Sequence, residues 1–456
     1  MTDVVGALRA ASAGEVSAPG EPAYTAATTP ENSSFPQHPA AVVKAVAAKE
    51  ISSVVAIAAA HGLRVVVQAT GHGAGEAVTD DEILLDTSAM NTVAVDAGTR
   101  TARVGAGVTW PAVQNAAMRH GLLGLSGTSP TVGVAGYTFG GGVGWLVRKH
   151  GVAAAALRAV DYVDGTGRVR RAEPDADDVV DREALWAFRG GGPVGVATAL
   201  EIGLVPVHDL WTGYLLWPAD DLGAVAAAWA AACSAADRSV SSALSLLALP
   251  PAGPFPDDLL GRPVVHLSFA SPDGADGLAP MRAAVRDAAR PVIDTTAAGD
   301  TTSLAAIHLD PPAAVPARGE GRWLGPNAPD VLVQAFEAAH IGAPGGLSMI
   351  ELRHTETGPS TVAGALTSPA GPFLLHAVGA APDDQARGGI DRVLRDVEVA
   401  SRPAALGRAA RSFREGQPDA GDGLSASDLT RLRAVRDALD PQRVLHGHRD
   451  PTSSSS

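Results

Sequence analysis

The sequence predicts an α+β protein built from two domains of unequal size. Its 456 residues are more than one hydrophobic core usually supports, so at least two domains are expected. Strand and helix patterns are mixed along the whole chain, and the elements become longer after about residue 207. Aromatic residues make up only 4% of the chain, whereas there are 51 Gly and 33 Pro residues. This composition indicates many turns and close backbone approaches.

Composition also argues against several classes of function. The formal net charge of −14 disfavours a nucleic-acid partner, because phosphate binding needs a basic patch. The single cysteine, Cys233, allows no internal disulfide and no cysteine metal cluster, and it fits a reducing compartment. The histidines are scattered, so no metal site is expected. No apolar run has the length of a membrane span and the first residues lack a secretory signal, so a cytoplasmic protein without a membrane partner is expected.

The N-terminal arm and the first domain are predicted from short patterns. Residues 1–35 are rich in small and polar residues and predict a loosely held arm with one short helix. Residues 36–207 predict the first domain. Its predicted elements are a strand at 41–43, a helix at 51–61 that ends at Gly62, strands at 64–68 and 83–86, a hairpin of 92–96 with 101–106, a helix at 110–120, a second hairpin of 159–164 with 168–172, a helix near 185–189 and a strand at 194–205.

The rest of the chain predicts a second domain and a C-terminal segment. Residues 208–400 contain longer patterns, with strands at 214–217, 264–269, 349–353 and 373–378 and an alanine-rich helix at 221–235. Residues 401–456 predict a last helix at 427–439 and a disordered serine-rich tail.

Two glycine-rich loops in the first domain are the strongest functional signal. The first, Gln68–Gly75, follows a strand and carries one histidine, and the second runs from Gly127 to Trp145. Their backbone N–H groups could hold a pyrophosphate without basic side chains. Neither loop has the order of strand, Gly-x-Gly-x-x-Gly and helix that is typical of a Rossmann site. From the residues alone, tight structural turns are an equally good interpretation.

Five motifs occur in the order of a known flavoprotein family. They are Thr70–Gly73, Thr101–Gly107, Pro130–Gly136, Gly140–Trp145 and Leu185–Gly192. With them the chain resembles the FAD-linked oxidases related to p-cresol methylhydroxylase and vanillyl alcohol oxidase, and within these the berberine bridge enzyme-like group. The resemblance implies a two-lobed FAD-binding domain and an inserted substrate domain, whose antiparallel sheet is covered by helices. Leu439–Leu445 resembles the closing motif of the family and implies that the C-terminal segment returns to the FAD domain.

The resemblance also implies a set of cofactor-binding residues. His72 matches the histidine that commonly bonds covalently to the flavin ring, and Ser129 stands where some members carry a second, cysteine link, so one bond is expected. Val132 matches a valine that is associated with access of oxygen to the flavin, although an ordinary packed valine is an equally good interpretation. The implied set is Ala69, Thr70, Gly71, His72, Gly73, Ala74, Thr128, Ser129, Val132, Gly133, Ala135, Gly136, Thr138, Gly141, Gly142, Gly144, Val196 and His448.

Candidate catalytic residues come from strand alternation and from the second glycine-rich loop. In the predicted strand 349–353, alternation puts Glu351 and Arg353 on one face and Ile350 and Leu352 on the other. Tyr137 stands near the expected flavin and could stabilise its negative charge when reduced. His266 and His376 are alternatives on neighbouring predicted strands. Each of these polar residues could instead be structural, and the tyrosine base that is frequent in the family has no clear counterpart.

Together these observations predict an FAD-dependent oxidoreductase. The expected reaction takes hydride from a C–H next to a hydroxyl or amine of a small metabolite, sugar or natural-product intermediate, and passes the electrons to oxygen. A dehydrogenase with another acceptor and a noncatalytic flavin-binding protein remain alternatives. The sequence predicts neither the oligomeric state nor the substrate.

Overall fold

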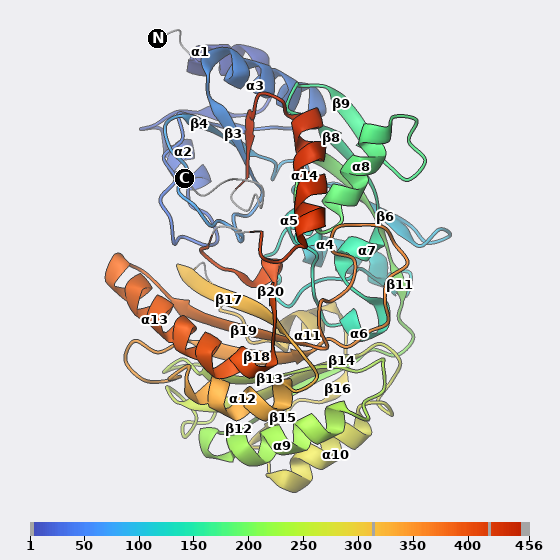
Figure 1. Cartoon of the computed structure of the whole chain (residues 1–456), viewed down its shortest axis with the longest axis vertical. Coiled ribbons are helices and arrows are strands. Elements are labelled where there is room, and N and C mark those ends of the chain that lie inside the picture. Colours follow the sequence, from blue (N-terminus) through green and yellow to red (C-terminus); the bar gives the residue numbers. More distant parts are fainter. Residues whose placement is uncertain (1–3, 312–314, 418–420, 448–456) are drawn as a thin grey trace.

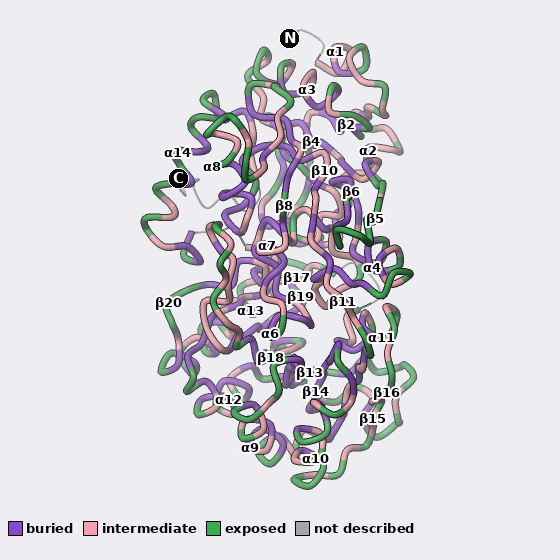
Figure 2. Tube along the Cα trace, turned by 90° about the vertical axis from the view of Figure 1, so that its right-hand side faces the viewer, coloured by how far each residue is buried: buried purple, intermediate pink, exposed green. Residues whose placement is uncertain are grey.

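The computed structural model describes residues 4–311, 315–417 and 421–447, which form two lobes (Figure 1). The upper lobe in this view combines N-terminal elements with the C-terminal helix, and the lower lobe contains a large sheet with helices on its outer side. Figure 2 shows that the strands of both lobes are largely buried and that the connecting loops are the most exposed segments. Among the described residues, no helix combines the length and the apolar character needed to cross a bilayer.

A small, mostly parallel sheet forms the first half of the upper lobe. The order is β1-β2-β4-β3-β21, and only β1 runs antiparallel to its neighbour. Helix α3 packs on it through Ile51, Val54 and Ala58, and ends at Gly62 as predicted. The bounds are β1 Val16–Ser17, β2 Ala41–Lys44, α3 Ala48–His61, β3 Arg64–Gln68, β4 Glu82–Asp86 and β21 Leu445–His446.

The N-terminal segment is more ordered than the expectation of a loose arm. It contains two helices, α1 (Val4–Ala11) and α2 (Pro22–Ala27), and strand β1 pairs with β2. Leu8 is fully buried in the same hydrophobic core as α3. The segment is ordered, although it is rich in small and polar residues. Burial of its apolar side chains and pairing of its backbone offset the conformational entropy that it loses on folding.

A second, antiparallel sheet completes the upper lobe. Its order is β5-β6-β10-β8-β9, and helices α4 and α8 share a hydrophobic core with it. The bounds are β5 Val93–Asp96, β6 Thr101–Gly105, α4 Trp110–Met118, β7 Leu122–Leu123, α5 Val134–Phe139, α6 Val147–His150, α7 Ala153–Ala156, β8 Leu157–Val163, β9 Val169–Ala172, α8 Val179–Phe188, β10 Val196–Gly203 and β11 Val205–Pro206.

The lower lobe is organised around a nine-stranded antiparallel sheet. Its order is β15-β12-β14-β13-β18-β19-β17-β20, with β16 paired to β12. The bounds are β12 Trp211–Pro218, α9 Leu222–Cys233, β13 Ser241–Ala248, β14 Pro263–Ser271, α10 Ala279–Ala288, β15 Ile293–Asp294, β16 Ala297–Ala298, α11 Thr301–Ala306, β17 Ala317–Leu324, α12 Ala328–Glu337, β18 Met349–His354, β19 Phe373–Ala380, α13 Asp384–Ser401 and β20 Ala405–Ala409.

The two faces of this sheet have different chemistry. On one face, leucine, isoleucine and phenylalanine side chains such as Ile350, Leu352 and Leu375 join helices α9, α10, α12 and α13 in the largest hydrophobic core. The other face lies toward the upper lobe (Figure 1). Alternation along the strands therefore places the residues between the apolar ones at the boundary between the lobes.

The C-terminal segment returns to the upper lobe, as the closing motif implies. Helix α14 (Ala426–Leu439) packs near α8, and β21 adds to the parallel sheet beside β3. The buried Asp440 side chain accepts hydrogen bonds from the N–H groups of Val444 and Leu445, at 2.9 and 2.8 Å. The upper lobe is thus made from both ends of the described chain. The predicted serine-rich tail lies outside the described residues, and the predicted boundaries at residues 36, 208 and 401 stay predictions.

Candidate active site

The two glycine-rich loops come together in the upper lobe. The first follows β3 and the second leads into α5. A Cβ atom added at Gly133 would lie 3.9 Å from the Cβ atom of Ala69, so the loops approach each other at van der Waals distance. Gly133 also forms a bridge with Thr109, and the N–H of Val134 donates to the carbonyl of Val108. The predicted cofactor residues from both loops thus share one region.

The loop around His72 has a backbone that requires glycine. Gly71 has a φ of +71°, and a Cβ atom there would lie 2.4 Å from the Cβ atom of Pro30; a larger residue would suffer both strain and a clash. The loop is anchored by N–H groups of Glu31 and Asn32, which donate to the carbonyls of Thr70 and Gly71. The N–H of His72 donates to Thr70 Oγ1 at 3.3 Å. His72 is half-buried.

Tyr137 occupies the inside of the second loop. Its ring lies against Gly127 and Gly142 and makes an edge contact with Trp110 at 5.6 Å between ring centroids. A Cβ atom at Gly144 would lie 1.7 Å from the carbonyl oxygen of Ser126, so this turn also requires glycine. The Tyr137 hydroxyl is buried and has no hydrogen-bond partner among the described residues. Burial raises its pKa, so the hydroxyl stays protonated and can donate.

The remaining predicted cofactor residues fall into three groups. Thr128 and Ser129 lie at the boundary with the lower lobe, and Ser129 Oγ is 3.3 Å from Thr131 Oγ1. Gly141 and Gly142 contact Leu366 and Ala153, while Thr138 Oγ1 is buried without a partner among the described residues. The others that lie along the loops are Gly73, Ala74, Val132, Ala135 and Gly136. Val196 lies in the hydrophobic core at the start of β10. His448 lies outside the described residues.

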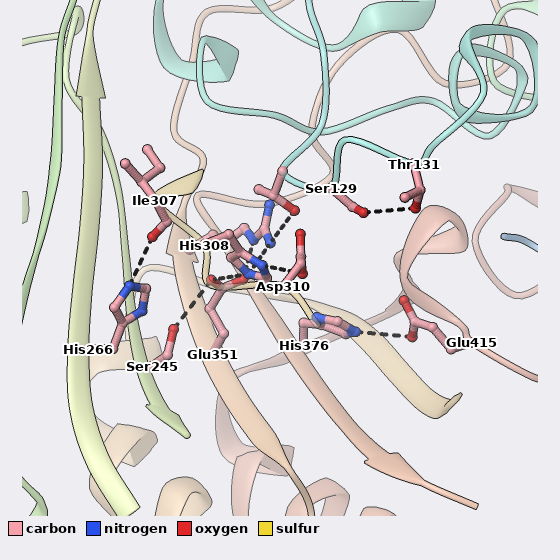
Figure 3. Close-up of polar contacts among 12 residues, drawn as sticks. Ser129, Thr131, Ser245, His266, Ile307, His308, Asp310, Glu351, His376 and Glu415 are labelled. Carbon is pink, nitrogen blue, oxygen red and sulfur yellow. Dashed lines mark hydrogen bonds and ion pairs between the residues drawn. The ribbon is translucent and has the colours of Figure 1, made fainter. Parts of the chain in front are cut away.

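A row of polar side chains crosses the sheet of the lower lobe on the face toward these loops. Glu351 on β18 is paired with Ser245 on β13 and with His376 on β19. Ser245 is in turn paired with His266 on β14. Directly paired residues of an antiparallel sheet point to the same face, so the four side chains form one line. Figure 3 shows them beneath the loop that carries Ser129 and Thr131.

Glu351 is the centre of a buried charged network. Its Oε1 accepts a short hydrogen bond from Arg353 Nε, and its Oε2 lies 3.1 Å from His308 Nε2 and 3.4 Å from Ser245 Oγ. His308 Nδ1 donates to Asp310 Oδ1 at 2.8 Å. Arg353 Nη2 also lies 3.1 Å from His308 Nε2. A protonated His308 donates its Nε2 proton to Glu351 and so cannot accept a hydrogen bond from Arg353. The two cations are therefore neighbours that bind the same carboxylate.

The charges of the network are set by their mutual proximity. Burial disfavours the charged form of His308, but Asp310 and Glu351 outweigh it and raise the pKa of His308 to about 9. Burial also opposes ionisation of Glu351, yet Arg353 and His308 hold the pKa of Glu351 well below its usual range. Burial would raise the pKa of Asp310 as well, but the charge of His308 outweighs burial and lowers this pKa. At neutral pH the network holds two carboxylates, one guanidinium and one imidazolium.

Arg353 connects this network to the second glycine-rich loop. Its Nη2 lies 3.5 Å from Thr128 Oγ1, and its guanidinium carbon stands 4.8 Å from the ring centroid of Phe413 and 5.8 Å from that of Trp145. Contacts with aromatic faces suit a guanidinium that is buried away from water. Glu351 and Arg353 therefore lie against the loop whose inside Tyr137 occupies.

The two alternative histidines have different surroundings. His266 is fully buried, and burial together with the charge of His308 lowers the pKa of His266 to about 4. It is therefore neutral, and its Nε2 lies 3.0 Å from the carbonyl of Ile307, which anchors the end of α11. His376 Nε2 lies 3.0 Å from Glu415 Oε2, while its Nδ1 is buried without a partner among the described residues. The Nδ1 of His266 is likewise buried without a partner among the described residues, and both histidines belong to the polar row.

Sequence reasoning missed His308 and Asp310. Both lie in the loop after α11, where no strand alternation applies. Leu309 between them has a φ of +62°, an unusual conformation for a residue with a side chain, and the two flanking residues form the 2.8 Å hydrogen bond across it. The only signal in the sequence was two ionisable residues separated by one apolar residue after an alanine-rich stretch, which is too common to predict a site.

The residues between the lobes fit a flavin better than a metal ion. Two buried hydroxyls without partners, Tyr137 and Thr138, and the close loops around Gly133 suit a cofactor that takes hydrogen bonds and backbone contacts. In the part of the chain that the structure describes, no group of three or more His, Cys, Asp or Glu residues could hold a metal ion.

Comparison of the sequence with known proteins identifies the cofactor domain. Residues 39–173 match the family model described as an FAD binding domain. The chain is 31% identical over 207 residues to (R)-6-hydroxynicotine oxidase of Paenarthrobacter nicotinovorans, a match that covers 45% of this chain and 44% of that protein. The matches span less than half of the length of the curated relatives.

Comparison of the structure extends the likeness to the whole chain. The crystal structure of 6-hydroxy-D-nicotine oxidase from Arthrobacter nicotinovorans superimposes with a TM-score of 0.83 at 21% identity, covering 97% of this chain and 98% of that one. The berberine bridge enzyme-like protein 1 of Physcomitrella patens gives a TM-score of 0.80 at 18% identity, covering 99% and 100%. The chain therefore contains an FAD-binding domain at residues 39–173, and over nearly its whole length it has the fold of 6-hydroxy-D-nicotine oxidase and of this berberine bridge enzyme-like protein.

Proposed function

We propose that this protein is an FAD-dependent oxidase of a small molecule that carries a hydroxyl or an amine on the carbon to be oxidised. The observation that carries the proposal is the buried network of Glu351, Arg353 and His308, which lies against the FAD-binding loops through the contact between Arg353 and Thr128. When bound, FAD would accept a hydride from the substrate carbon and later pass the electrons to oxygen. The protein must bind the substrate, orient it and take its proton.

FAD is proposed to lie between the two glycine-rich loops, with a single covalent bond to His72. Support comes from the approach of Gly133 to Ala69, from the unpartnered Tyr137 hydroxyl and from the FAD-binding domain match. Ser129 has no thiol and Cys233 is buried in the core of the lower lobe, so a second, cysteine link is not proposed. The buried Tyr137 would donate its hydroxyl proton as a hydrogen bond where negative charge develops.

Glu351 is assigned the role of orienting the substrate and receiving its proton. Its low pKa keeps it ionised, which is the form that accepts a hydrogen bond from an O–H or N–H group. A carboxylate of low pKa is ordinarily a weak base. As hydride leaves the carbon, however, the attached O–H or N–H becomes far more acidic, and a weak base is then sufficient. The proton leaves the substrate for Glu351 while the electron pair of the C–H bond leaves with the hydride.

Arg353 and His308 are assigned to hold Glu351 in place. They bond different oxygens of its carboxylate, so its orientation is fixed from two sides. His308 is itself held by Asp310. Such support from neighbouring side chains keeps a reactive group within the narrow range of geometry that proton transfer requires.

A first prediction concerns the bond to flavin. Acid precipitation of the yellow protein should leave the flavin on the polypeptide, whereas His72→Ala should release it into the supernatant. Exposed His120 at the end of the α4 region provides a control, since His120→Ala should behave like the unchanged protein. Release of all flavin from the unchanged protein would contradict the proposed bond.

A second prediction concerns oxygen. Val132 is half-buried in the second glycine-rich loop, and Val132→Leu should slow reoxidation of the reduced protein by air by about tenfold, because one added methylene can close a tight path. Val93→Leu, at another half-buried valine packed against the same core, is the matched control and should leave reoxidation unchanged. Slow reoxidation of the unchanged protein would instead favour a dehydrogenase with another acceptor.

A third prediction concerns pH. The pKa of His308 rises from 6.5 to about 9 on folding, so its proton stabilises the folded state fully below pH 6.5 and this contribution is lost as the pH rises through 9. The contribution is on the order of 3 kcal/mol. Chemical denaturation at pH 6.5, 8 and 9.5 should show a decline for the unchanged protein that is largely absent in His308→Gln. An equal decline in both proteins would show that His308 is not the titrating group.

A further inference from the structure

A cavity of about 230 Å³ lies at the boundary between the lobes, beside the candidate active site. It is formed by α4 and the loop at 126–130 from the upper lobe and by α11 from the lower lobe, two helices that lie near each other in Figure 2. This volume is smaller than that of a typical site for a drug-sized ligand and suits a single ring with its substituents. The FAD-binding domain match ends at residue 173, and no predicted site residue lies on α11, which forms one side of the cavity.

The cavity has a rigid floor and an open rim. Trp110, Gln114 and Leu304 are buried, whereas Asn115 and Thr302 are exposed. The Gln114 amide is fully engaged: its Oε1 accepts from the N–H of Gly124 at 2.7 Å, and its Nε2 donates to the Gly124 carbonyl at 3.1 Å and to Ser126 Oγ at 2.8 Å. The floor is therefore preformed, which limits the entropy cost of binding.

The two sides of the rim are tied across the lobes. Thr301 Oγ1 donates to Asn115 Oδ1 at 2.9 Å, which joins the start of α11 to α4. The Trp110 indole N–H is buried and has no partner among the described residues. This nitrogen has no exposed surface, so the polar groups that the cavity offers are the hydroxyls and amides of its other lining residues.

The lining contains no ionisable side chain. Its members are either apolar or carry uncharged hydroxyl, amide or indole groups: Trp110, Pro111, Gln114, Asn115, Ser126, Gly127, Thr128, Ser129, Pro130, Thr301, Thr302, Leu304 and Ala305. A second cavity of about 530 Å³ on the upper lobe is different, since Arg158, Arg171 and Glu173 are among its lining residues. An ionised ligand group would lose water in the smaller cavity without gaining a counter-charge, which is unfavourable.

One lining residue connects the cavity with the charged network. Thr128 lines the cavity, and its Oγ1 lies 3.5 Å from Arg353 Nη2. Thr128 thus stands between the cavity and the network, and a substrate that reached the network from the cavity would pass Thr128. The lining of the cavity would then determine which chemical groups the unreactive end of the substrate can carry.

We propose that this cavity is the outer substrate subsite and that it takes an uncharged ring bearing hydroxyl, carbonyl or amide groups. The proposal rests on the proposed oxidase function, because it assigns the reacting end of the same molecule to Glu351. It narrows the substrate class to compounds whose distal part is neutral and polar, such as a sugar or a hydroxylated heterocycle. Ionised carboxylates and amines are excluded from that part.

Three probes of equal shape test the charge rule directly. Benzamide, benzoate and benzamidine differ in charge but scarcely in size, and their binding to the flavin-loaded full chain can be followed by flavin difference absorbance and by tryptophan fluorescence. Benzamide should bind at least about tenfold more tightly than either ion, since burial without a partner costs the ions more than this. Equal affinity for all three, tighter binding of an ion, or no binding of benzamide would overturn the proposal.

Two variants locate the bound probe. Thr302→Phe at the exposed rim should lower benzamide affinity by at least about tenfold and leave the flavin content unchanged. Arg158→Phe, on the exposed edge of the larger cavity, is the matched control and should leave benzamide affinity unchanged. Full affinity in Thr302→Phe would overturn the proposal, and loss of flavin in that variant would assign the cavity to the cofactor instead. Benzamide binding requires no turnover, so failure of the oxidase function would be seen separately as a flavin that no substrate reduces.

Discussion

The buried ion pair between Glu351 and Arg353 is the interaction on which the arrangement of the site depends. Glu351 is fully buried and Arg353 is only 5% exposed, and charges taken out of water at this depth are tolerated only when they are paired and hydrogen-bonded. Removal of one partner from such a pair typically costs about 3–5 kcal/mol. Thr128, His308 and the aromatic rings of Phe413 and Trp145 surround the pair through contacts with Arg353.

The sheet of the lower lobe can carry this pair because its two faces differ: one packs against helices and the other faces the upper lobe. The apolar face is covered by four helices and supplies the largest core, and the opposite face carries buried polar groups that are paired with one another. Strand pairing then aligns His266, Ser245, Glu351 and His376 in one row under the glycine-rich loops. Both the ordered N-terminal segment and the return of the chain at β21 stabilise the lobe that carries these loops.

Much of this arrangement could be predicted from the sequence where a repeating physical rule applies. Period-two alternation placed Glu351 and Arg353 on the same face, and the five motifs placed both glycine-rich loops in an FAD-binding domain, which the family match confirms. Strands β13 and β17 were not predicted. β13 is serine-rich and buried on both faces, and β17 contains two glycines and charged residues, so neither has the usual strand pattern.

The unpredicted part of the site depends on contacts between segments far apart in the chain. His308 and Asp310 act on Glu351 only because the loop after α11 folds over β18, and a loop has no periodicity from which this could be inferred. The same holds for Thr128, which meets Arg353 across 225 positions of sequence. The neutral state of His266 also follows from tertiary burial and from the charge of His308.

In the proposed reaction Glu351, held by Arg353 and His308, receives the proton of the substrate beside the flavin. The most direct measurement is the rate of anaerobic flavin reduction in Glu351→Gln, followed by stopped-flow absorbance with a substrate that reduces the unchanged protein. We expect this rate to fall by about 10²–10⁴-fold at full flavin content, while Ser268→Ala, whose hydroxyl donates to the Ala243 carbonyl, changes it little. Reduction of Glu351→Gln at the rate of the unchanged protein would contradict the account.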